Sequence, residues 1–404
     1  MNSMKNHISE RMQNLPISSV RRLSPYANAA KAEGVQVYHL NIGAPDVKSP
    51  DVMIEALKNW QTNPIDYAPS EGTKEYIEAL KWYYHRLGHT FLKNQDILGT
   101  TAGSEALNIA MFACCDPGDE ILVFEPYYSN YAAIASMWGI KLVPVETSIE
   151  DGFHLPSRMA IERRISLKTK AILYCSPGNP TGTVYTKEEV ELLVTIAKEH
   201  NLYLISDEVY REYVFTGSRA TSLLSYMEEM PELAIVLDSL SKRYSICGAR
   251  LGCLVSLNQD IVRGGLKFAM SHLSAGMVDQ YIGSQLTKVP DSYILGIQQE
   301  YLLRRDTLYN GLKEIEGIKL SLPEGAFYLF AELPVEDAED FCIFLLEKYR
   351  DRGETVMLAP GNGFYATPGK GQNTVRFAYV LEVPKLKRAI ELLKSGLEAY
   401  KNSR

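Results

Sequence analysis

"AIVLDSLSKRYSICGARLG", residues 234–252, is the stretch that decides the fold. It opens with the apolar run 234–238, which is typical of a strand covered on both faces of a sheet. Two hydroxyls, an amine and a guanidinium follow closely: Ser239, Ser241, Lys242 and Arg250. Hydroxyls and a guanidinium suit a phosphate, because they donate hydrogen bonds to its oxygens. A lysine at a strand end is usually a solvent-exposed charge, so this stretch alone leaves the role of the amine open.

Similar apolar runs recur on both sides of this stretch and alternate with helical segments. The predicted strands are 96–101, 120–125, 141–146, 171–176, 202–207, 234–239 and 251–256. The predicted helices between them are 104–115, 129–138, 187–199 and 260–269. This alternation predicts an α/β fold with a mostly parallel sheet, and such sheets bind ligands at the carboxyl ends of their strands.

The pattern changes after about residue 290. A long charged helix, a strand-rich segment, a second helix, a strand and a closing helix follow, at 292–315, 318–333, 337–350, 373–381 and 384–399. The N-terminal residues should pack on this part, because the long helix returns the chain to their side. We therefore expect a large domain at 46–290, with a seven-stranded sheet between helices, and a smaller α+β domain built from 1–45 and 291–404.

Composition narrows the classes of protein. The 404 residues include 42 basic and 49 acidic ones, and this modest acidic excess, without a long basic run, predicts no nucleic-acid partner. The N-terminus lacks the apolar core of a signal peptide, and no apolar run approaches the roughly 18 residues that span a bilayer. The six cysteines form no C-x-x-C pair, which predicts reduced thiols and no metal site. We expect a cytoplasmic protein.

Other predicted strands also end in residues that can carry chemistry. In "TTAGSEAL", Ser104 is a candidate N-cap at a helix start that could bind an anion. "FEPYYSNY" (124–131) supplies a tyrosine that could stack on a flat ring, and the stiff loop "SPGNPTG" could direct the Asn179 amide. "ISDEVY" brings Asp207 and Tyr210 to a strand end. Each feature alone is equally typical of an ordinary cap, turn or packed ring.

Together these groups meet the needs of pyridoxal phosphate, which has a phosphate, a flat ring, a pyridine nitrogen, a ring hydroxyl and an aldehyde. The chain resembles the class I/II aminotransferases, which are fold-type I pyridoxal-phosphate enzymes. The motifs that carry the resemblance keep their order along the chain. They are "NIGAPD", "YAPSEG", "AGSEAL", "PYY", "SPGNPTG", "SDEVY", "SKRYSICGARLG" and "VRFAY".

The resemblance implies roles for single residues. Lys242 would bond the cofactor aldehyde and later carry a proton, and Asp207 would pair with the pyridine nitrogen. Tyr210 and Asn179 would bind the ring hydroxyl, and Tyr128 would stack on the ring. The residues implied at the phosphate are Gly103, Ser104, Glu105, Ser239, Ser241 and Arg250.

The resemblance also implies how substrate is bound. Arg376 would hold the substrate α-carboxylate, beside Asn179. Gly43 would lie so close to the substrate that any side chain would intrude. Tyr67 would reach the phosphate of a neighbouring subunit, which implies a homodimer with shared sites. The Asn179–Pro180 bond is often cis in the family, so a cis bond is expected here.

The expected reaction moves an amino group from an L-amino acid to a 2-oxo acid, with 2-oxoglutarate as acceptor, by ping-pong chemistry. Aspartate is the first choice of donor, and alanine, aromatic and other donors stay open. One dicarboxylate-specific subgroup carries a lysine where this chain has Glu105. Other groups that could contact the substrate are Arg21, Arg22, His272 and Tyr365.

Two other classes of function stay open. The same framework supports a C–S β-lyase, which would release pyruvate and ammonia from a cysteine conjugate. A regulator that uses the fold as a sensor is disfavoured, because such chains carry a DNA-binding domain ahead of it, and fewer than 45 residues precede "NIGAPD".

Overall fold

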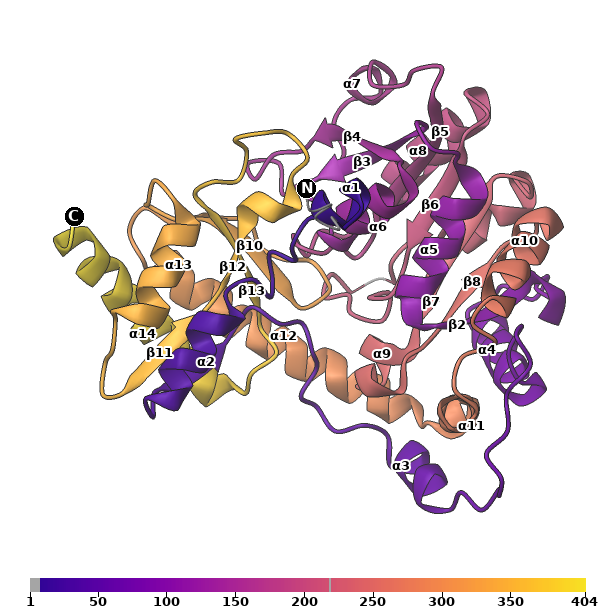
Figure 1. Ribbon diagram of the computed structural model, residues 1–404, viewed down its shortest axis with the longest axis horizontal. Helices are drawn as coiled ribbons and strands as arrows, with labels where there is room; N and C mark the ends of the chain where they lie inside the picture. The colour runs from indigo at the N-terminus through magenta and orange to yellow at the C-terminus, as the bar shows by residue number, and fades with distance from the viewer. Residues whose placement is uncertain (1–7, 218) are drawn as a thin grey trace, which may run out of the picture.

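The computed structural model describes residues 8–217 and 219–404, which form a seven-stranded sheet with helices on both faces and a second, smaller lobe (Figure 1). The sheet order is β2-β8-β7-β6-β5-β3-β4. Its strands are β2 (Ile97–Thr101), β3 (Glu120–Glu125), β4 (Lys141–Glu146), β5 (Thr169–Cys175), β6 (Tyr203–Asp207), β7 (Ala234–Ser239) and β8 (Leu251–Val255). Only β8 runs against its neighbours β2 and β7, so the predicted α/β fold with a mostly parallel sheet is confirmed.

Helices cover both faces of this sheet because its strands are apolar on both sides. In β3, Ile121 and Val123 face one core, whereas Leu122 and Phe124 face the other. The first core is covered by α5 (Ala102–Cys114), α6 (Asn130–Trp138) and α10 (Gln259–Met270). The second is covered by α4 (Lys74–Arg86), α8 (Lys187–Glu199) and α11 (Met277–Ser284). Shorter helices are α1 (Glu10–Gln13), α3 (Asp51–Lys58), α7 (Arg158–Glu162) and α9 (Leu240–Arg243).

The two ends of the chain meet in the smaller lobe. A four-stranded antiparallel sheet has the order β12-β13-β10-β9, with β9 (Lys319–Leu320), β10 (Tyr328–Glu332), β12 (Ala359–Pro360) and β13 (Thr374–Ala378). N-terminal β1 (Gln36–His39) pairs in parallel with β11 (Glu354–Met357). The helices are α2 (Ser24–Ala32), α12 (Asp291–Lys313), α13 (Ala338–Glu347) and α14 (Val383–Asn402). The domain limits at residues 46 and 290 stay a prediction.

Five short 3₁₀ helices complete the described part of the chain: η1 (Asn94–Asp96), η2 (Leu223–Glu229), η3 (Cys247–Ala249), η4 (Gln285–Lys288) and η5 (Gly361–Phe364). In residues 8–217 and 219–404, no helix combines the length and the apolar character that a membrane crossing requires.

The predicted N-cap at Ser104 is wrong. Helix α5 begins at Ala102, so Ser104 lies inside its first turn. The backbone N–H of Thr101 is bound instead by the carboxylate of Glu105, which reaches back over that turn. Glu105 thus makes only the reverse bond of a capping box, to the N–H of the N-cap residue, and no side chain of the described chain caps the first N–H groups of α5.

Gly252 sets how closely three elements meet at the centre of the sheet. A Cβ on Gly252 would lie 2.5 Å from the carbonyl carbon of Ala102 and 2.7 Å from the backbone oxygen of Asp238. It would also lie 2.7 Å from the backbone nitrogen of Gly103. The absence of a side chain thus lets the start of α5 lie against the end of β7, which brings backbone N–H groups beside Ser239.

Gly252→Ala should lower the free energy of unfolding by about 1–3 kcal/mol, the usual cost of overpacking, because backbone rather than a flexible side chain would have to move. Gly248→Ala is the matched control, since a Cβ at Gly248 meets nothing within 4 Å. Chemical denaturation measures both variants. Equal stability of the two would contradict this account of Gly252.

Candidate active site

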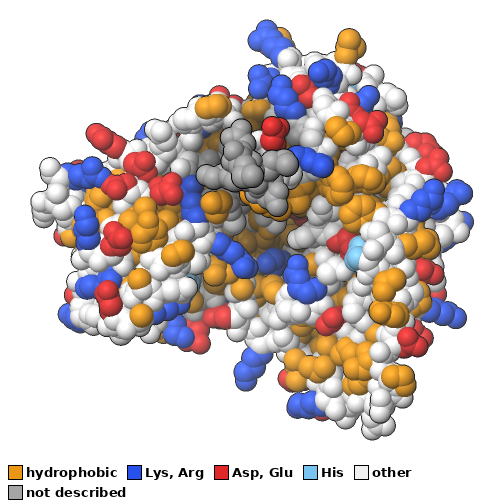
Figure 2. Space-filling view, viewed as in Figure 1, with side chains coloured by type: hydrophobic (Ala, Val, Ile, Leu, Met, Phe, Trp, Pro, Cys, Tyr) orange, Lys and Arg blue, Asp and Glu red, His pale blue; other side chains and the backbone are white. Residues whose placement is uncertain are grey.

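A cavity of about 620 Å³ opens at the carboxyl ends of β6 and β7, between the large sheet and the smaller lobe. Figure 2 shows this hollow near the centre of the visible face, with Lys and Arg side chains gathered along its edge. The structure brings these predicted residues to its wall: Gly43, Gly103, Ser104, Tyr128, Asn179, Asp207, Tyr210, Ser239, Ser241, Lys242, Arg250 and Arg376. Its size is that of a pocket for a small organic ligand, for which about 300–1,000 Å³ is usual.

Lys242 lies on α9, the single helical turn that follows β7. Its ammonium group donates a hydrogen bond of 2.7 Å to the carbonyl of Gly43, and the thiol of Cys247 lies 3.8 Å from Nζ. Burial lowers the pKa of Lys242, and the charges of Arg376 and Arg250 lower it further. A lowered pKa leaves more of the amine uncharged and able to attack a carbonyl carbon.

Asp207 ends β6 and is buried. Its Oδ2 accepts a 2.7 Å hydrogen bond from the hydroxyl of Tyr131 in α6. Burial raises the pKa of Asp207 to about 6, although the bond from Tyr131 opposes the rise. Such a carboxylate gains from a cationic partner, because the partner offsets the cost of burying its charge. Sequence reasoning missed Tyr131, the third tyrosine of "PYYSNY".

Asn179 connects two parts of the site. Its Nδ2 lies 3.5 Å from the Tyr210 hydroxyl, and its Oδ1 accepts a 3.0 Å hydrogen bond from Nη1 of Arg376. The hydroxyl of Tyr210 also lies 2.9 Å from that of Tyr328. Tyr328 was not predicted as a site residue, since it lies inside β10 in the smaller lobe. The expected cis bond between Asn179 and Pro180 is present.

Arg376 reaches the cavity from β13, and only 2% of the residue is exposed. Its Nη2 donates to the carbonyl of Asn41, and its guanidinium lies 4.5 Å from the ring centre of Tyr328. Its Nε has no hydrogen-bond partner in residues 8–217 and 219–404. No carboxylate pairs with it in that part of the chain, so this buried cation is suited to an anionic ligand.

Gly43 packs directly against the side chain of Tyr328, which leaves no room for a side chain at residue 43. A Cβ at this position would lie 1.8 Å from the hydroxyl oxygen of Tyr328. The same glycine offers its carbonyl to Lys242. A side chain at residue 43 would therefore displace the tyrosine that packs against Arg376.

The predicted phosphate-binding groups lie together, with one exception. The Ser239 hydroxyl lies 2.9 Å from that of Ser241 and accepts the Ser241 backbone N–H at 3.2 Å. Arg250 has a left-handed backbone (φ 52°) and an exposed side chain. Glu105 does not line the cavity, because its carboxylate binds Thr101 N–H and contacts His272.

The sequence left open the roles of Arg21, Arg22 and Tyr365. Of these three residues, Arg21 lines the cavity. Arg22 instead pairs with Glu339 at 2.7 Å, and Tyr365 packs on Phe330 outside the cavity. Tyr67 is 76% exposed and does not line the cavity of its own chain, so its predicted reach to a neighbouring subunit stays a prediction.

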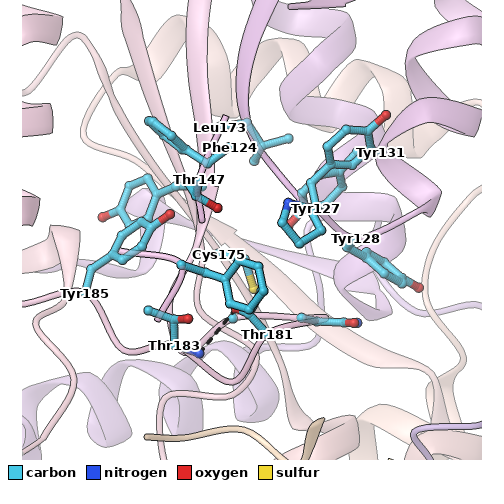
Figure 3. Close-up of a pocket in the computed structure, with 15 residues that line it drawn as sticks. Phe124, Tyr127, Tyr128, Tyr131, Thr147, Leu173, Cys175, Thr181, Thr183 and Tyr185 are labelled. Carbon is cyan, nitrogen blue, oxygen red and sulfur yellow. Dashed lines mark hydrogen bonds between the residues drawn. The ribbon is translucent and has the colours of Figure 1, made fainter. Parts of the chain in front are cut away.

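A second, much smaller cavity lies behind Tyr128 (Figure 3). Its volume is about 30 Å³, which is room for about one water molecule. Tyr128 lines both cavities and meets the ring of Tyr131 edge-on, with ring centres 5.5 Å apart. This support fixes Tyr128 as a wall of the larger cavity.

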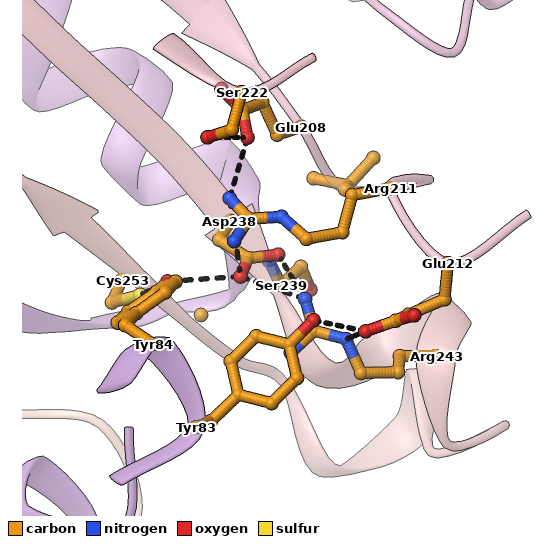
Figure 4. Close-up of polar contacts among 12 residues, drawn as sticks. Tyr83, Tyr84, Glu208, Arg211, Glu212, Ser222, Asp238, Ser239, Arg243 and Cys253 are labelled. Atoms are coloured by element: carbon orange, nitrogen blue, oxygen red, sulfur yellow. Dashed lines mark hydrogen bonds and ion pairs between the residues drawn. The ribbon is translucent and has the colours of Figure 1, made fainter. Parts of the chain in front are cut away.

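A buried network of charges surrounds Asp238 and Arg243, the latter being the residue after Lys242 (Figure 4). Both carboxylate oxygens of Asp238 accept hydrogen bonds from Nη2 of Arg243, at 2.8 and 2.9 Å. Asp238 also accepts the Tyr84 hydroxyl at 2.9 Å and the Ser239 backbone N–H at 2.7 Å. Burial acts to raise the pKa of Asp238, but Arg243 and Arg211 lower it below its ordinary value. The pair ties Asp238, in β7, to Arg243, the residue that directly follows Lys242.

Comparison with known proteins now assigns the class. Sequence and fold match aminotransferases over almost the whole chain, so the protein is an aminotransferase. It belongs to the family described as aminotransferase class I and II, whose model matches residues 35–393. Enzymes of this family depend on pyridoxal phosphate.

The similar proteins differ in the substrate that they are named for. The chain is 33% identical to aspartate aminotransferase of Thermotoga maritima over 403 residues, covering 98% of this chain and 100% of that one. A solved variant of Thermus thermophilus aspartate aminotransferase has a TM-score of 0.87 and 28% identity. Alanine aminotransferase of Pyrococcus furiosus also has a TM-score of 0.87, with 27% identity. Both solved structures match over 97% of this chain and 100% of theirs. The predicted family and enzyme class are confirmed, and the donor is not.

Asp238→Asn should lower the free energy of unfolding by about 3–5 kcal/mol, because it leaves the buried charge of Arg243 without its counter-charge. Glu55→Gln is the control, since it breaks an exposed pair with Lys58 and should change the stability little. Denaturant titration measures both. Similar costs for the two variants would show that the buried pair does not hold this region.

The raised pKa of Asp207 predicts a pH dependence of stability. Because the folded pKa of about 6 lies above the ordinary value of 3.8, the folded state holds this proton more tightly than the unfolded state. The cofactor-free protein should therefore lose about 3 kcal/mol from this group as the pH rises from 4 to above 6. Asp207→Asn should remove that loss, whereas Asp151→Asn, at an exposed position, should keep it. Urea titrations across this pH range measure the free energy of unfolding of each variant. If its pH dependence in Asp207→Asn equals that of the wild type, Asp207 is not the group responsible.

Proposed function

We propose that the chain binds pyridoxal phosphate in the large cavity and moves the amino group of an L-amino acid, aspartate first, to 2-oxoglutarate. The observation that carries the proposal is that Lys242, Asp207 and Arg376 line one cavity. Asp207 and Arg376 are both buried, and Arg376 has no carboxylate partner in the described chain. The amine and the carboxylate come from the ends of neighbouring parallel strands, β7 and β6. This places a reactive amine and a partner for a ring nitrogen at one edge of the sheet.

The residues present fit the cofactor. The carboxylate of Asp207 would pair with a protonated pyridine nitrogen, which offsets the cost of burying its charge. Tyr210 and Asn179 would donate to the ring hydroxyl, and Tyr128 would stack on the ring face. The phosphate would be held by the start of α5 and by Ser239, Ser241 and Arg250.

When bound, pyridoxal phosphate supplies an aldehyde that bonds the amino group and a ring that takes up the electrons released at the substrate Cα. Lys242 is first the amine that holds the aldehyde. With substrate bound in its place, Nζ of Lys242 would hold and move the proton of the substrate Cα. Its lowered pKa suits this work, because the free amine is the form that accepts a proton.

Arg376 would bind the substrate α-carboxylate with two parallel hydrogen bonds. This clamp would orient the substrate Cα. A carboxylate held by Arg376 would stay bound while the Cα proton is removed, which would favour loss of the proton over loss of the carboxylate. Asn179, which already binds Nη1 of Arg376, would keep the guanidinium in place.

We also propose a homodimer. Exposed apolar side chains concentrate between residues 54 and 67, where Ile65 and Tyr67 are 62% and 76% exposed. Such a patch marks a surface that another chain covers. Tyr67 would then donate to the phosphate in the neighbouring subunit. A cytoplasmic location is proposed because all six cysteines are free thiols.

Lys242→Ala should abolish amino-group transfer and leave a folded protein, because no other amine lines the cavity wall in the described chain. The measurement is single-turnover absorbance of the cofactor with a panel of amino acids, together with 2-oxoglutarate turnover. Wild-type activity in the variant would refute the role of Lys242. Pyruvate and ammonia from a cysteine conjugate, formed without 2-oxoglutarate, would identify the β-lyase instead.

A further inference from the structure

The cavity carries one more positive charge than the proposed function uses. Its wall holds one carboxylate, Asp207, and four cationic side chains: Arg21, Lys242, Arg250 and Arg376. Resting on the proposed function, Arg250 serves the cofactor phosphate, Lys242 the aldehyde and Arg376 the α-carboxylate. Arg21 is left without an anionic partner in that account.

The protein itself does not neutralise Arg21. No hydrogen bond or ion pair of its side chain occurs within residues 8–217 and 219–404. The adjacent Arg22 differs, because it pairs with Glu339 at 2.7 Å and donates to Asn362 at 2.5 Å. Of two neighbouring arginines, one therefore stabilises the smaller lobe, and the other faces the cavity.

The position of Arg21 is tied to the Arg376 clamp through one buried residue. The side-chain amide of Asn41 donates a 2.9 Å hydrogen bond to the carbonyl of Val20, the residue before Arg21. The backbone carbonyl of the same Asn41 accepts Nη2 of Arg376. The turn that carries Arg21 is closed by the bond from Ser24 N–H to its carbonyl, at 2.9 Å. The backbone at Arg21 is therefore linked through Asn41 to the Arg376 guanidinium, and the Arg21 side chain extends from it exposed and free to meet a ligand.

The surroundings of Arg21 suit a short carbon chain that ends in a charge. Val20, Ile42 and Leu107 supply apolar wall to the same cavity. Arg21 lines this cavity together with Tyr128 and Arg376. Glu105 does not oppose a second carboxylate here, because its own carboxylate is bound by Thr101 and His272 outside the cavity.

We propose that Arg21 binds the side-chain carboxylate of a dicarboxylic amino acid or oxo acid whose α-carboxylate is held by Arg376. Arg21 is thus the residue that selects an acidic substrate over a neutral one. The specificity arises from charge complementarity, since a monocarboxylate would leave the guanidinium without a counter-charge.

The test measures the binding of two unreactive four-carbon acids to the holoenzyme by titration calorimetry. Succinate carries two carboxylates and butyrate carries one. In Arg21→Gln, succinate affinity should fall roughly 10- to 100-fold, the range for a charge-assisted bond, and butyrate affinity should stay unchanged. Arg22→Gln is the matched control and should change neither. Arg21→Lys should restore part of the succinate affinity, because the charge returns without the fork.

Succinate affinity that is unchanged in Arg21→Gln, or butyrate affinity that falls equally, would overturn the proposal. The ratio of the succinate affinity to the butyrate affinity does not depend on turnover, so it tests the role of Arg21 independently of the proposed reaction. Absence of amino-group transfer by the wild-type enzyme with every donor would refute the proposed function. If single-turnover rates show that Arg21→Gln has lost the preference for aspartate over alanine, the result supports both the proposed function and the role of Arg21.

Discussion

The buried ion pair between Asp238 and Arg243 is the interaction on which the rest of the site depends. One partner precedes Lys242 in the chain and the other follows it, so their bond fixes the turn that carries the amine. Asp238 also holds the Ser239 backbone N–H, and Ser239 in turn contacts Ser241. Because an unpaired charge at this depth would be costly, the turn has few alternative conformations. The hydroxyls and the amine are thereby presented on one side of the strand end.

Three groups in the site destabilise the ligand-free protein. Burial raises the pKa of Asp207 and lowers that of Lys242, so each group resists the charge that it normally carries. Arg376 is buried with no carboxylate beside it in the described chain. A ligand with a cationic ring nitrogen, a carbonyl carbon and a carboxylate would relieve all three costs at once. Perturbed groups that converge in one cavity are typical of catalytic sites.

The fold was predictable because the signals for it are local. Continuous apolar strands between helices predict a parallel sheet, and parallel strands bring their carboxyl ends to one edge. Lys242, Asp207 and Asn179 each follow such a strand, so their meeting could be inferred. Tyr328 and Asn41 could not be inferred, because they act through partners far away in the sequence. Tyr328 meets Tyr210 across 118 positions, and Asn41 meets Arg376 across 335. Ser104 misled because α5 begins two residues before it, at Ala102, so its hydroxyl cannot cap the helix, and Glu105 binds the N–H of the N-cap residue Thr101.

Covalent labelling tests the central claim most directly. Holoenzyme reduced with borohydride and then digested should carry a pyridoxyl group on one peptide, and fragmentation by mass spectrometry should place it on Lys242. A label on any other lysine, or no label after reduction of cofactor-saturated protein, would contradict the account.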